Sequence, residues 1–241
     1  MKSDEFLQKM RLAASVKSLY VKGCFGAPLN DTNKKRYTQN NVYNKRPART
    51  AKINAASADT FGSDCCGIIK GVLWGWNADP SKRYGGAEYK SNGVPDVGAD
   101  GMIKACKDAS ADFTNIEPGM LVWMSGHVGI YVGGGQVVES SPSFDDGCQY
   151  TNLGNLGVKT GNWRNWTKCG HLPWVEYNGA SSAEKPQNGA NSQPQYYTVV
   201  KGDTMTKIAI KYDTTLAELK KLNPKIKNIS RIYPGQLIRV R

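Results

Sequence analysis

The segment from 178 to 195 is the feature that most constrains how this chain can fold, because it contains no large apolar side chain. Its Gly, Ala, Ser, Asn, Gln and Pro residues cannot build a hydrophobic core, and such a composition is typical of a flexible tether. We therefore predict an N-terminal domain at 1–177, a flexible linker at 178–195 and a small C-terminal domain at 196–241. With 241 residues, 39% of them hydrophobic, the chain can supply one medium and one small core.

The N-terminal part combines a helical pattern with later strand-length runs. Apolar residues recur at spacings of three and four from Phe6 to Leu19, which predicts an amphipathic helix, and 68–76 predicts a buried helix. Apolar runs of strand length follow at 119–125, 127–132 and 136–140. Gly133, Gly134 and Gly135 join the last two runs and suit a hairpin turn. Helices followed by an antiparallel sheet predict the α+β class.

Residues 27–60 are polar and basic, and their pattern predicts a long loop or insertion. The basic side chains could be solvated or could grip an anionic polymer, and the sequence favours the first interpretation. The formal net charge of +12 indicates an anionic partner, which could be nucleic acid, a membrane surface or an acidic polymer. No nucleic-acid-binding motif accompanies the charge, so we expect no nucleic acid partner.

The N-terminus carries Asp4 and Glu5 where a secretory signal needs basic residues before an apolar run. We therefore expect a protein that is made in the cytoplasm without a signal peptide. No apolar run approaches the ~18 residues of a membrane-spanning helix, so no stable membrane insertion is expected.

The chain has six cysteines without CxxC spacing, which indicates reduced thiols rather than a disulfide framework. It has only two histidines and no HExxH motif, so zinc hydrolysis is disfavoured. We predict neither a metal nor another cofactor.

Cys65 follows Ser63 and Asp64, either of which can cap a helix, so the cysteine falls in the first helical turn. The helix dipole and free N–H groups there favour a thiolate, with a pKa lowered from ~8.5 toward ~3.5 to 7.5. The imidazole partner must be His127 or His171, and only His127 begins a strand that fixes its direction. His171 fits a structural role.

Glu139 lies on the returning strand of the hairpin, where it could face His127 and accept its second N–H. Cysteine, histidine and carboxylate then form a catalytic triad. Each residue alone has a simpler explanation, as a core cysteine, a structural histidine or a solvated carboxylate. The joint pattern favours catalysis.

Two motifs carry a resemblance to a known family. Asp64-Cys65-Cys66-Gly67 resembles the Asp-Cys-Ser-Gly motif, and 127–131 resembles the His-Val-Gly-Ile-Tyr motif, of the NlpC/p-sixty cell-wall peptidases. The resemblance covers about 6–177. It implies a papain-like fold with Cys65 as nucleophile, His127 as base and Glu139 at the third catalytic position.

The same resemblance implies substrate-binding roles for Tyr20, Asp64 and Cys66. Residues 20–24 are similar to the family's Tyr-x-Trp-Gly-Gly stretch, although Lys22 and Cys24 depart from it. Cys66 takes the serine place, which leaves the accepted stem peptide open. Family members commonly hydrolyse the γ-D-glutamyl to diamino-acid bond of peptidoglycan.

Residues 196–241 resemble a LysM domain, because Gly202-Asp203-Thr204, Leu222-Asn223 and 233–236 occur in the expected order. The resemblance implies a β-α-α-β fold that binds glycans containing N-acetylglucosamine. The residues it implies for glycan binding are Gly202, Asp203, Thr204, Met205, Asn228 and Ile229.

Together these features predict a peptidoglycan hydrolase that resembles a phage or prophage endolysin and acts on the wall after release. Its partner would be bacterial peptidoglycan, both stem peptide and glycan. Three alternatives stay open: an N-acetylmuramoyl-L-alanine amidase, a host autolysin exported by another route, and a non-catalytic wall-binding protein.

Overall fold

The computed structural model describes residues 1–177 and, in the C-terminal part, 196–200, 203–205, 208, 209, 212, 214, 216–224, 226, 228, 232, 233 and 235–240. The Cα positions divide the chain into two compact units, Met1–Asn178 and Gly179–Arg241. The predicted linker at 178–195 lies outside the described residues.

The predicted opening helix is α1, which spans Ser3–Ser15. Its buried face includes Phe6, Leu7 and Met10, as the apolar spacing indicates. The helix ends earlier than the apolar pattern, because Val16 has extended backbone at the C-cap. Leu19 belongs instead to strand β1, Ser18–Tyr20.

A three-stranded sheet has the order β1-β3-β2, with β2 at Phe25–Pro28 and β3 at Phe61–Ser63. Two helices connect β2 to β3, α2 at Asp31–Asn40 and α3 at Pro47–Ala55. The prediction of a long loop at 27–60 was therefore wrong. These helices bury few apolar side chains, mainly Tyr37 and Ile53, so their sequence lacks the periodic apolar face that signals a helix.

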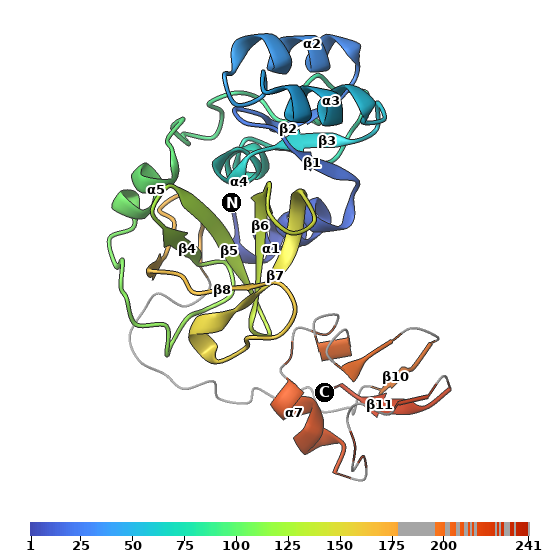
Figure 1. Ribbon diagram of the computed structural model, residues 1–241. Helices are drawn as coiled ribbons and strands as arrows, with labels where there is room; N and C mark the ends of the chain where they lie inside the picture. Colours follow the sequence, from blue (N-terminus) through green and yellow to red (C-terminus); the bar gives the residue numbers. More distant parts are fainter. Residues whose placement is uncertain are drawn as a thin grey trace. The chain divides into compact units, whose positions relative to one another are not determined.

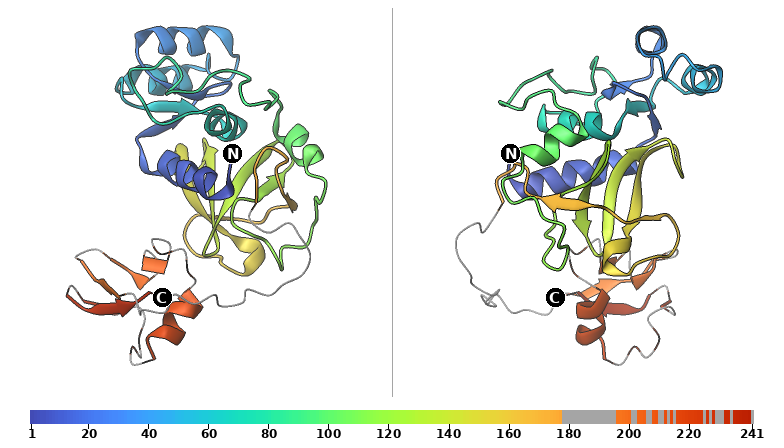
Figure 2. Two further views of the ribbon diagram at one scale, coloured as in Figure 1. Left: turned by 180° about the vertical axis from the view of Figure 1, so that it is seen from behind. Right: turned by 60° about the vertical axis from the view of Figure 1, so that its left-hand side comes forward.

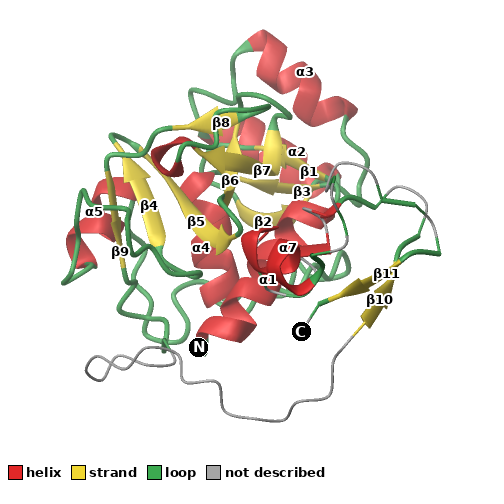
Figure 3. Ribbon diagram, turned by 90° about the horizontal axis from the view of Figure 1, so that it is seen from below, coloured by secondary structure: helices red, strands yellow, loops and turns green. Residues whose placement is uncertain are grey.

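Helix α4, Cys65–Leu73, follows β3 directly and is buried along most of its length. It lies between the three-stranded sheet and the larger sheet (Figure 1). Helices α1 and α4 pack against each other and against strands β5 and β6 (Figure 3). The predicted buried helix at 68–76 is thus present, although it ends at Leu73. A further helix, α5, spans Ala99–Ala105.

The larger sheet has six strands in the order β8-β7-β6-β5-β4-β9 and is curled (Figure 2). Its bounds are β4 Leu121–Met124, β5 His127–Gly133, β6 Gln136–Ser141, β7 Gly147–Leu153, β8 Trp163–Arg164 and β9 Lys168–Gly170. A 3-10 helix, η1, spans Gly154–Leu156. The three predicted strands correspond to β4, β5 and β6.

The β5–β6 hairpin turns at Gly133, Gly134 and Gly135, which all have positive φ. Residues that carry a side chain rarely adopt a positive φ, so glycine suits each position. The predicted hairpin is confirmed.

In the C-terminal unit, β10 at Tyr196–Thr198 pairs antiparallel with β11 at Leu237–Arg239. Helix α7 spans Leu216–Leu222. A small core of its own includes Val199, Met205, Ile208, Leu219 and Ile238. Both units mix helices with strands, so the α+β class is confirmed. Among the described residues, no helix has the length and apolar character needed to cross a bilayer.

Candidate active site

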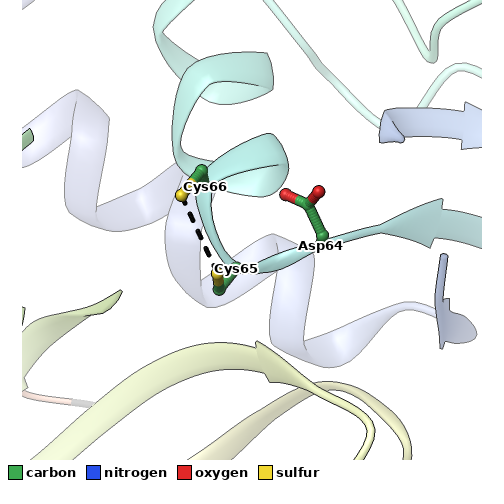
Figure 4. Close-up of side chains that lie close together, drawn as sticks. All are labelled: Asp64, Cys65 and Cys66. Atoms are coloured by element: carbon green, nitrogen blue, oxygen red, sulfur yellow. Dashed lines mark hydrogen bonds between the residues drawn. The ribbon is translucent and has the colours of Figure 1, made fainter. Parts of the chain in front are cut away.

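Cys65 occupies the first position of α4, and Asp64 is the N-cap. The two carboxylate oxygens of Asp64 accept hydrogen bonds from Gly67 N at 2.6 Å and from Gly23 N at 2.7 Å. The first bond caps the helix, and the second ties its start to the turn between β1 and β2. Figure 4 shows Cys65 and Cys66 with their sulfurs facing each other, and Asp64 beside the start of the helix. The cysteine is therefore held at a fixed helix N-terminus.

His127 is the first residue of β5, and its Nε2 lies 2.5 Å from Glu139 Oε2. Since Glu139 engages Nε2, Nδ1 is the ring nitrogen left to exchange a proton with Cys65. The His127 side chain is 18% exposed, whereas that of Glu139 is fully buried. The structure thus brings the predicted base and acid into direct contact.

Glu139 reaches His127 diagonally rather than from directly across the hairpin. A Cβ built on Gly129 would lie 3.3 Å from Glu139 Cβ and 2.5 Å from Val137 Cγ1, so Glu139 stands beside Gly129. Diagonal neighbours on one face of a sheet are within reach of long side chains. Because Gly129 has no side chain, the space beside it is open, and Glu139 contacts the His127 imidazole across this space.

Arg164 and Thr151 fix the carboxylate of Glu139, and neither was predicted. Arg164 Nε lies 2.8 Å from Oε1 and 2.9 Å from Oε2, and Thr151 Oγ1 donates to Oε1 at 2.7 Å. Arg164 also donates to Ser141 Oγ at 3.0 Å. An arginine flanked by tryptophans is a weak sequence signal, and only the pairing of β7 with β8 brings it to the site.

Trp166 stacks on His127, with ring centroids 5.4 Å apart and planes at 14°. It is only 3% exposed, so it covers one face of the imidazole against water. Its backbone N–H donates to Asn155 Oδ1 at 2.7 Å. Trp166 is thus buried against the candidate base.

The pKa of Cys65 is lowered to about 4. The largest cause is a hydrogen bond from the Cys66 thiol, and burial opposes it; His127 and the Val128 N–H lower the pKa further. Burial alone would lower the pKa of His127, but hydrogen bonds and charge from Cys65 and Glu139 raise it to about 9. Burial opposes ionisation of Glu139, yet the contact with His127 lowers its pKa. Near neutral pH these directions favour a thiolate–imidazolium pair beside a carboxylate.

Of the predicted substrate-binding residues, Asp64 and Cys66 flank Cys65 at the start of α4, and Tyr20 is near enough for the charge of Cys65 to act on it. The sulfurs of Cys65 and Cys66 are 3.8 Å apart, and that contact raises the pKa of Cys66. Burial raises the pKa of Tyr20, and the charges of Asp64 and Cys65 add to it. Burial likewise raises the pKa of Asp64. Tyr20 also packs edge-on against Tyr43 at 5.8 Å.

Asp64, Cys65 and Cys66 place one potential metal-ligand atom each within 4.8 Å of one another. The Asp64 oxygens already accept backbone N–H groups, and the two thiols share a hydrogen bond. These contacts account for the grouping as a helix cap and a thiol pair, and we assign no metal to it.

His171 lies in a different environment from Cys65. Its Nδ1 is 2.5 Å from Asp108 Oδ2, Nε2 is 3.6 Å from Glu117 Oε2, and its ring packs edge-on against Tyr177. These contacts join the segments before β4 and after β9, in keeping with the expected structural role.

Four of the six residues expected to bind glycan are described, while Gly202 and Ile229 lie outside the described residues. Asp203 Oδ2 accepts from the Tyr197 hydroxyl at 2.7 Å and from Val200 N at 2.9 Å, which closes the turn after β10. Thr204 and Asn228 are exposed, whereas Met205 is buried in the small core. Met205 therefore supports the fold, and its predicted glycan contact remains a prediction.

Residues 197–241 match the family model described as LysM domain. The C-terminal segment is a LysM domain. Similar proteins include chlorophenol reductase of Desulfitobacterium hafniense, 54% identical over 46 residues, which are 19% of this chain and 14% of that protein. The endolysin of Bacillus phage B103 is 51% identical over 45 residues, 19% of this chain and 17% of the endolysin. The endolysin of Bacillus phage PZA is 34% identical over 104 residues, 38% of this chain and 40% of the endolysin.

The chain spans less than half the length of each of these relatives. It shares distant homology with phage endolysins. The matches to the reductase and to the phage B103 endolysin are similarly short, so these two matches do not define the chemistry of the N-terminal unit.

Proposed function

We propose that this protein is an endolysin-like peptidoglycan hydrolase, a cysteine peptidase that uses Cys65, His127 and Glu139 and is held at the wall by its LysM domain. The observation that carries the proposal is the buried Glu139–His127 contact next to a cysteine at a helix N-terminus. Its similarity to proteins named endolysin supports the cell wall as the target. The Asp-Cys and His-Val-Gly-Ile-Tyr motifs support a papain-like peptidase of the NlpC/p-sixty type.

In the proposed reaction the Cys65 thiolate attacks the carbonyl carbon of a stem-peptide amide bond. The backbone N–H of Cys65, in the first helical turn, stabilises the oxyanion. His127 then gives its proton to the departing amine as the C–N bond breaks, leaving a thioester on Cys65. His127 takes a proton from water, and the resulting hydroxide attacks the thioester carbon. The C–S bond then breaks, which releases the carboxylic acid of the stem peptide and restores the thiolate.

Glu139 keeps Nε2 of His127 bonded, so Nδ1 stays directed at the sulfur and the reacting carbonyl. Arg164 and Thr151 prevent the carboxylate from turning away. This is a positioning and charge-stabilising role, because Glu139 does not touch the substrate.

The Cys65→Ala and Cys66→Ala variants test the proposal. We expect Cys65→Ala to abolish lysis of purified walls while sparing wall binding, because the nucleophile is gone and the LysM domain is intact. Cys66→Ala removes the hydrogen bond that lowers the pKa of Cys65 most, but it keeps the nucleophile and His127, so it should retain measurable lysis. Equal loss in both variants, or full lysis by Cys65→Ala, would contradict the assignment and favour a non-catalytic wall-binding protein.

The bond we propose is the γ-D-glutamyl to diamino-acid amide. Mass spectrometry of digested walls identifies the new amino terminus. A new terminus on the diamino acid supports the endopeptidase, whereas a new terminus on L-alanine would instead identify an N-acetylmuramoyl-L-alanine amidase.

A further inference from the structure

Cys66 places a second thiol beside the candidate nucleophile. Its Sγ lies 3.8 Å from Cys65 Sγ, and Figure 4 shows the two sulfurs facing each other at the start of α4. All six cysteines lie within the described residues 1–177, and there no other pair of thiols is hydrogen-bonded. Cys106 and Cys169 donate to backbone carbonyl oxygens instead. The proposed hydrolysis has no step for the Cys66 sulfur, so the contact calls for another explanation.

The ionisation that makes Cys65 a nucleophile also makes it open to oxidation, because hydroperoxides react with thiolates to give sulfenic acids. A sulfenic acid either condenses with a nearby thiol to a disulfide or is oxidised further to a sulfinic acid, which thiol reductants do not restore. The position of a second thiol decides between these outcomes. Cys66 is the next residue and is only 8% exposed, so its thiol meets an oxidised Cys65 without diffusing to it.

The raised pKa of Cys66 does not prevent this condensation. Its largest cause is the hydrogen bond to Cys65, followed by burial and then by the negative charge of Cys65. A sulfenic acid on Cys65 is neutral, so the charge disappears and the Cys66 proton no longer bonds to a thiolate. Cys66 therefore gives up its proton more easily after Cys65 has been oxidised than before.

The backbone makes a bond between these two sulfurs strained. The sulfurs must close from 3.8 Å to about 2.0 Å. Adjacent Cα atoms are about 3.8 Å apart across a trans peptide, whereas disulfide-linked Cα atoms are usually at least about 4.4 Å apart. Closure therefore distorts the first turn of α4, where Asp64 accepts from Gly67 N. Strain makes a disulfide easier to reduce, so this bond should reopen readily with a thiol reductant.

We propose that Cys65 and Cys66 form a reversible oxidation site, in which Cys66 resolves the sulfenic acid that a hydroperoxide produces on Cys65. The inference goes beyond the proposed hydrolysis. In the first step the Cys65 sulfur attacks a peroxide oxygen, the O–O bond breaks, and the departing oxygen takes a proton from His127. In the second step the Cys66 sulfur attacks the Cys65 sulfur, the S–O bond breaks, and the hydroxide leaves with the Cys66 proton as water.

Two electrons thus pass from the thiol pair to the hydroperoxide. The disulfide removes the nucleophile and stops hydrolysis. A dithiol reductant gives the two electrons back, becomes a disulfide itself and restores both thiols. Without Cys66, the sulfenic acid would persist and go on to the sulfinic acid.

Peptide mapping after treatment with hydrogen peroxide tests the proposal. Free thiols are blocked with iodoacetamide, and the protein is digested with trypsin without reductant, which places Cys65 and Cys66 in one peptide, 53–70. In the wild type this peptide should lose two hydrogen atoms and carry no iodoacetamide label, and dithiothreitol should restore both the label and most of the lytic rate. A wild-type peptide that gains oxygen without forming the disulfide overturns the proposal.

Cys66→Ser keeps a hydroxyl donor beside Cys65 but removes the resolving sulfur. Its peptide should form a dimedone adduct when dimedone is present during oxidation, and otherwise gain two oxygen atoms as the sulfinic acid. Dithiothreitol should then restore less than about a tenth of its own untreated lytic rate, because the sulfinic acid is not reduced. Full recovery in Cys66→Ser contradicts the resolving role.

Cys169→Ser is the matched control, because it removes a buried thiol that bonds to Asp112 O rather than to Cys65. It should behave as the wild type. Thermal unfolding establishes that both serine variants are folded, and the wild-type peptide tests the disulfide without either of them. If the disulfide forms but untreated protein does not lyse walls, the oxidation site stands and the hydrolase assignment fails. If untreated protein lyses walls but peroxide yields no disulfide, the hydrolase assignment stands and the oxidation site fails.

Discussion

At the scale of single residues, the candidate site contains one charged residue beyond the three that were predicted, because Arg164 pairs with Glu139. Glu139 is fully buried, and a buried carboxylate is costly unless it is paired. His127 on one side and Arg164 on the other provide that pairing. The arrangement stabilises the imidazolium, which in turn stabilises the Cys65 thiolate.

The pH dependence of hydrolysis follows from these pKa shifts. The reaction needs Cys65 deprotonated and His127 protonated, so kcat/KM should rise with pH through about 4 and fall through about 9. Glu139→Gln removes a charge that raises the pKa of His127, so the alkaline limb should move to lower pH. The rate at the optimum should fall about 100-fold or more, because the base loses its orientation.

Thr151→Val is the matched control for this prediction, because it removes a hydrogen bond to Glu139 but keeps the charge. Its alkaline limb should stay close to that of the wild type. An alkaline limb that is unmoved in Glu139→Gln would show that the carboxylate does not act on His127.

The sequence was sufficient to select Cys65, His127 and Glu139 for one site, because helix capping and hairpin return depend on residues close in sequence. It did not reveal Arg164, Thr151 or Trp166. Their positions depend on strand pairing in the larger sheet and on a loop after β8, which local patterns do not encode. The catalytic roles themselves remain predictions.

At the scale of elements, α4 is the part that positions the nucleophile, because it lies between the two sheets (Figure 1). Gly67 and Gly71 sit one turn apart on the face toward β2. A Cβ on Gly67 would lie 1.9 Å from Cys24 O, and one on Gly71 would lie 2.4 Å from Phe25 O. The absence of side chains lets the helix approach the neighbouring backbone.

Gly67→Ala should therefore lower the free energy of unfolding by about 3 kcal/mol, because the helix must move away from the backbone at Cys24. Gly98→Ala is the control, since a Cβ there meets no atom within 4 Å and the change should cost less than about 1 kcal/mol. Urea denaturation measures both. Equal free energies of unfolding for the two variants would contradict the close approach of α4 to the backbone at Cys24.

Helices α2 and α3 were the main error at this scale. Asn30 accepts from Asn33 N as the α2 cap, and Pro47 stands in the first turn of α3, so start signals are present in the sequence. We missed these helices because their residues are mostly polar and form no periodic apolar face. Nor are the basic residues all solvated, because Arg49 and Lys52 both pair with Asp146 at 2.6 Å.

At the scale of the whole molecule, the chain has two units with separate cores. We propose that the N-terminal unit hydrolyses peptidoglycan and that the C-terminal unit binds it. The composition of the 178–195 segment indicated separate cores, because a stretch without large apolar residues cannot join them. The C-terminal identity was also accessible from sequence, since LysM motifs are local and ordered.

Removal of residues 178–241 tests this division of tasks. The shortened protein should lyse insoluble walls at least about tenfold more slowly, because the LysM domain no longer raises its concentration at the substrate. Hydrolysis of a soluble stem peptide should be unchanged. If both rates fall equally, the C-terminal unit contributes to catalysis or folding rather than to tethering.

The ionisation of Cys65 is the central claim, and alkylation by iodoacetamide as a function of pH, followed by peptide mapping, measures it most directly. Burial raises the pKa of Cys24, Cys106, Cys148 and Cys169, and contact with Cys65 raises that of Cys66, so only Cys65 should react at pH 6. Its reactivity should follow a pKa near 4 and shift upward in His127→Ala. Reaction of Cys65 only above about pH 8, as for an ordinary thiol, would contradict the account.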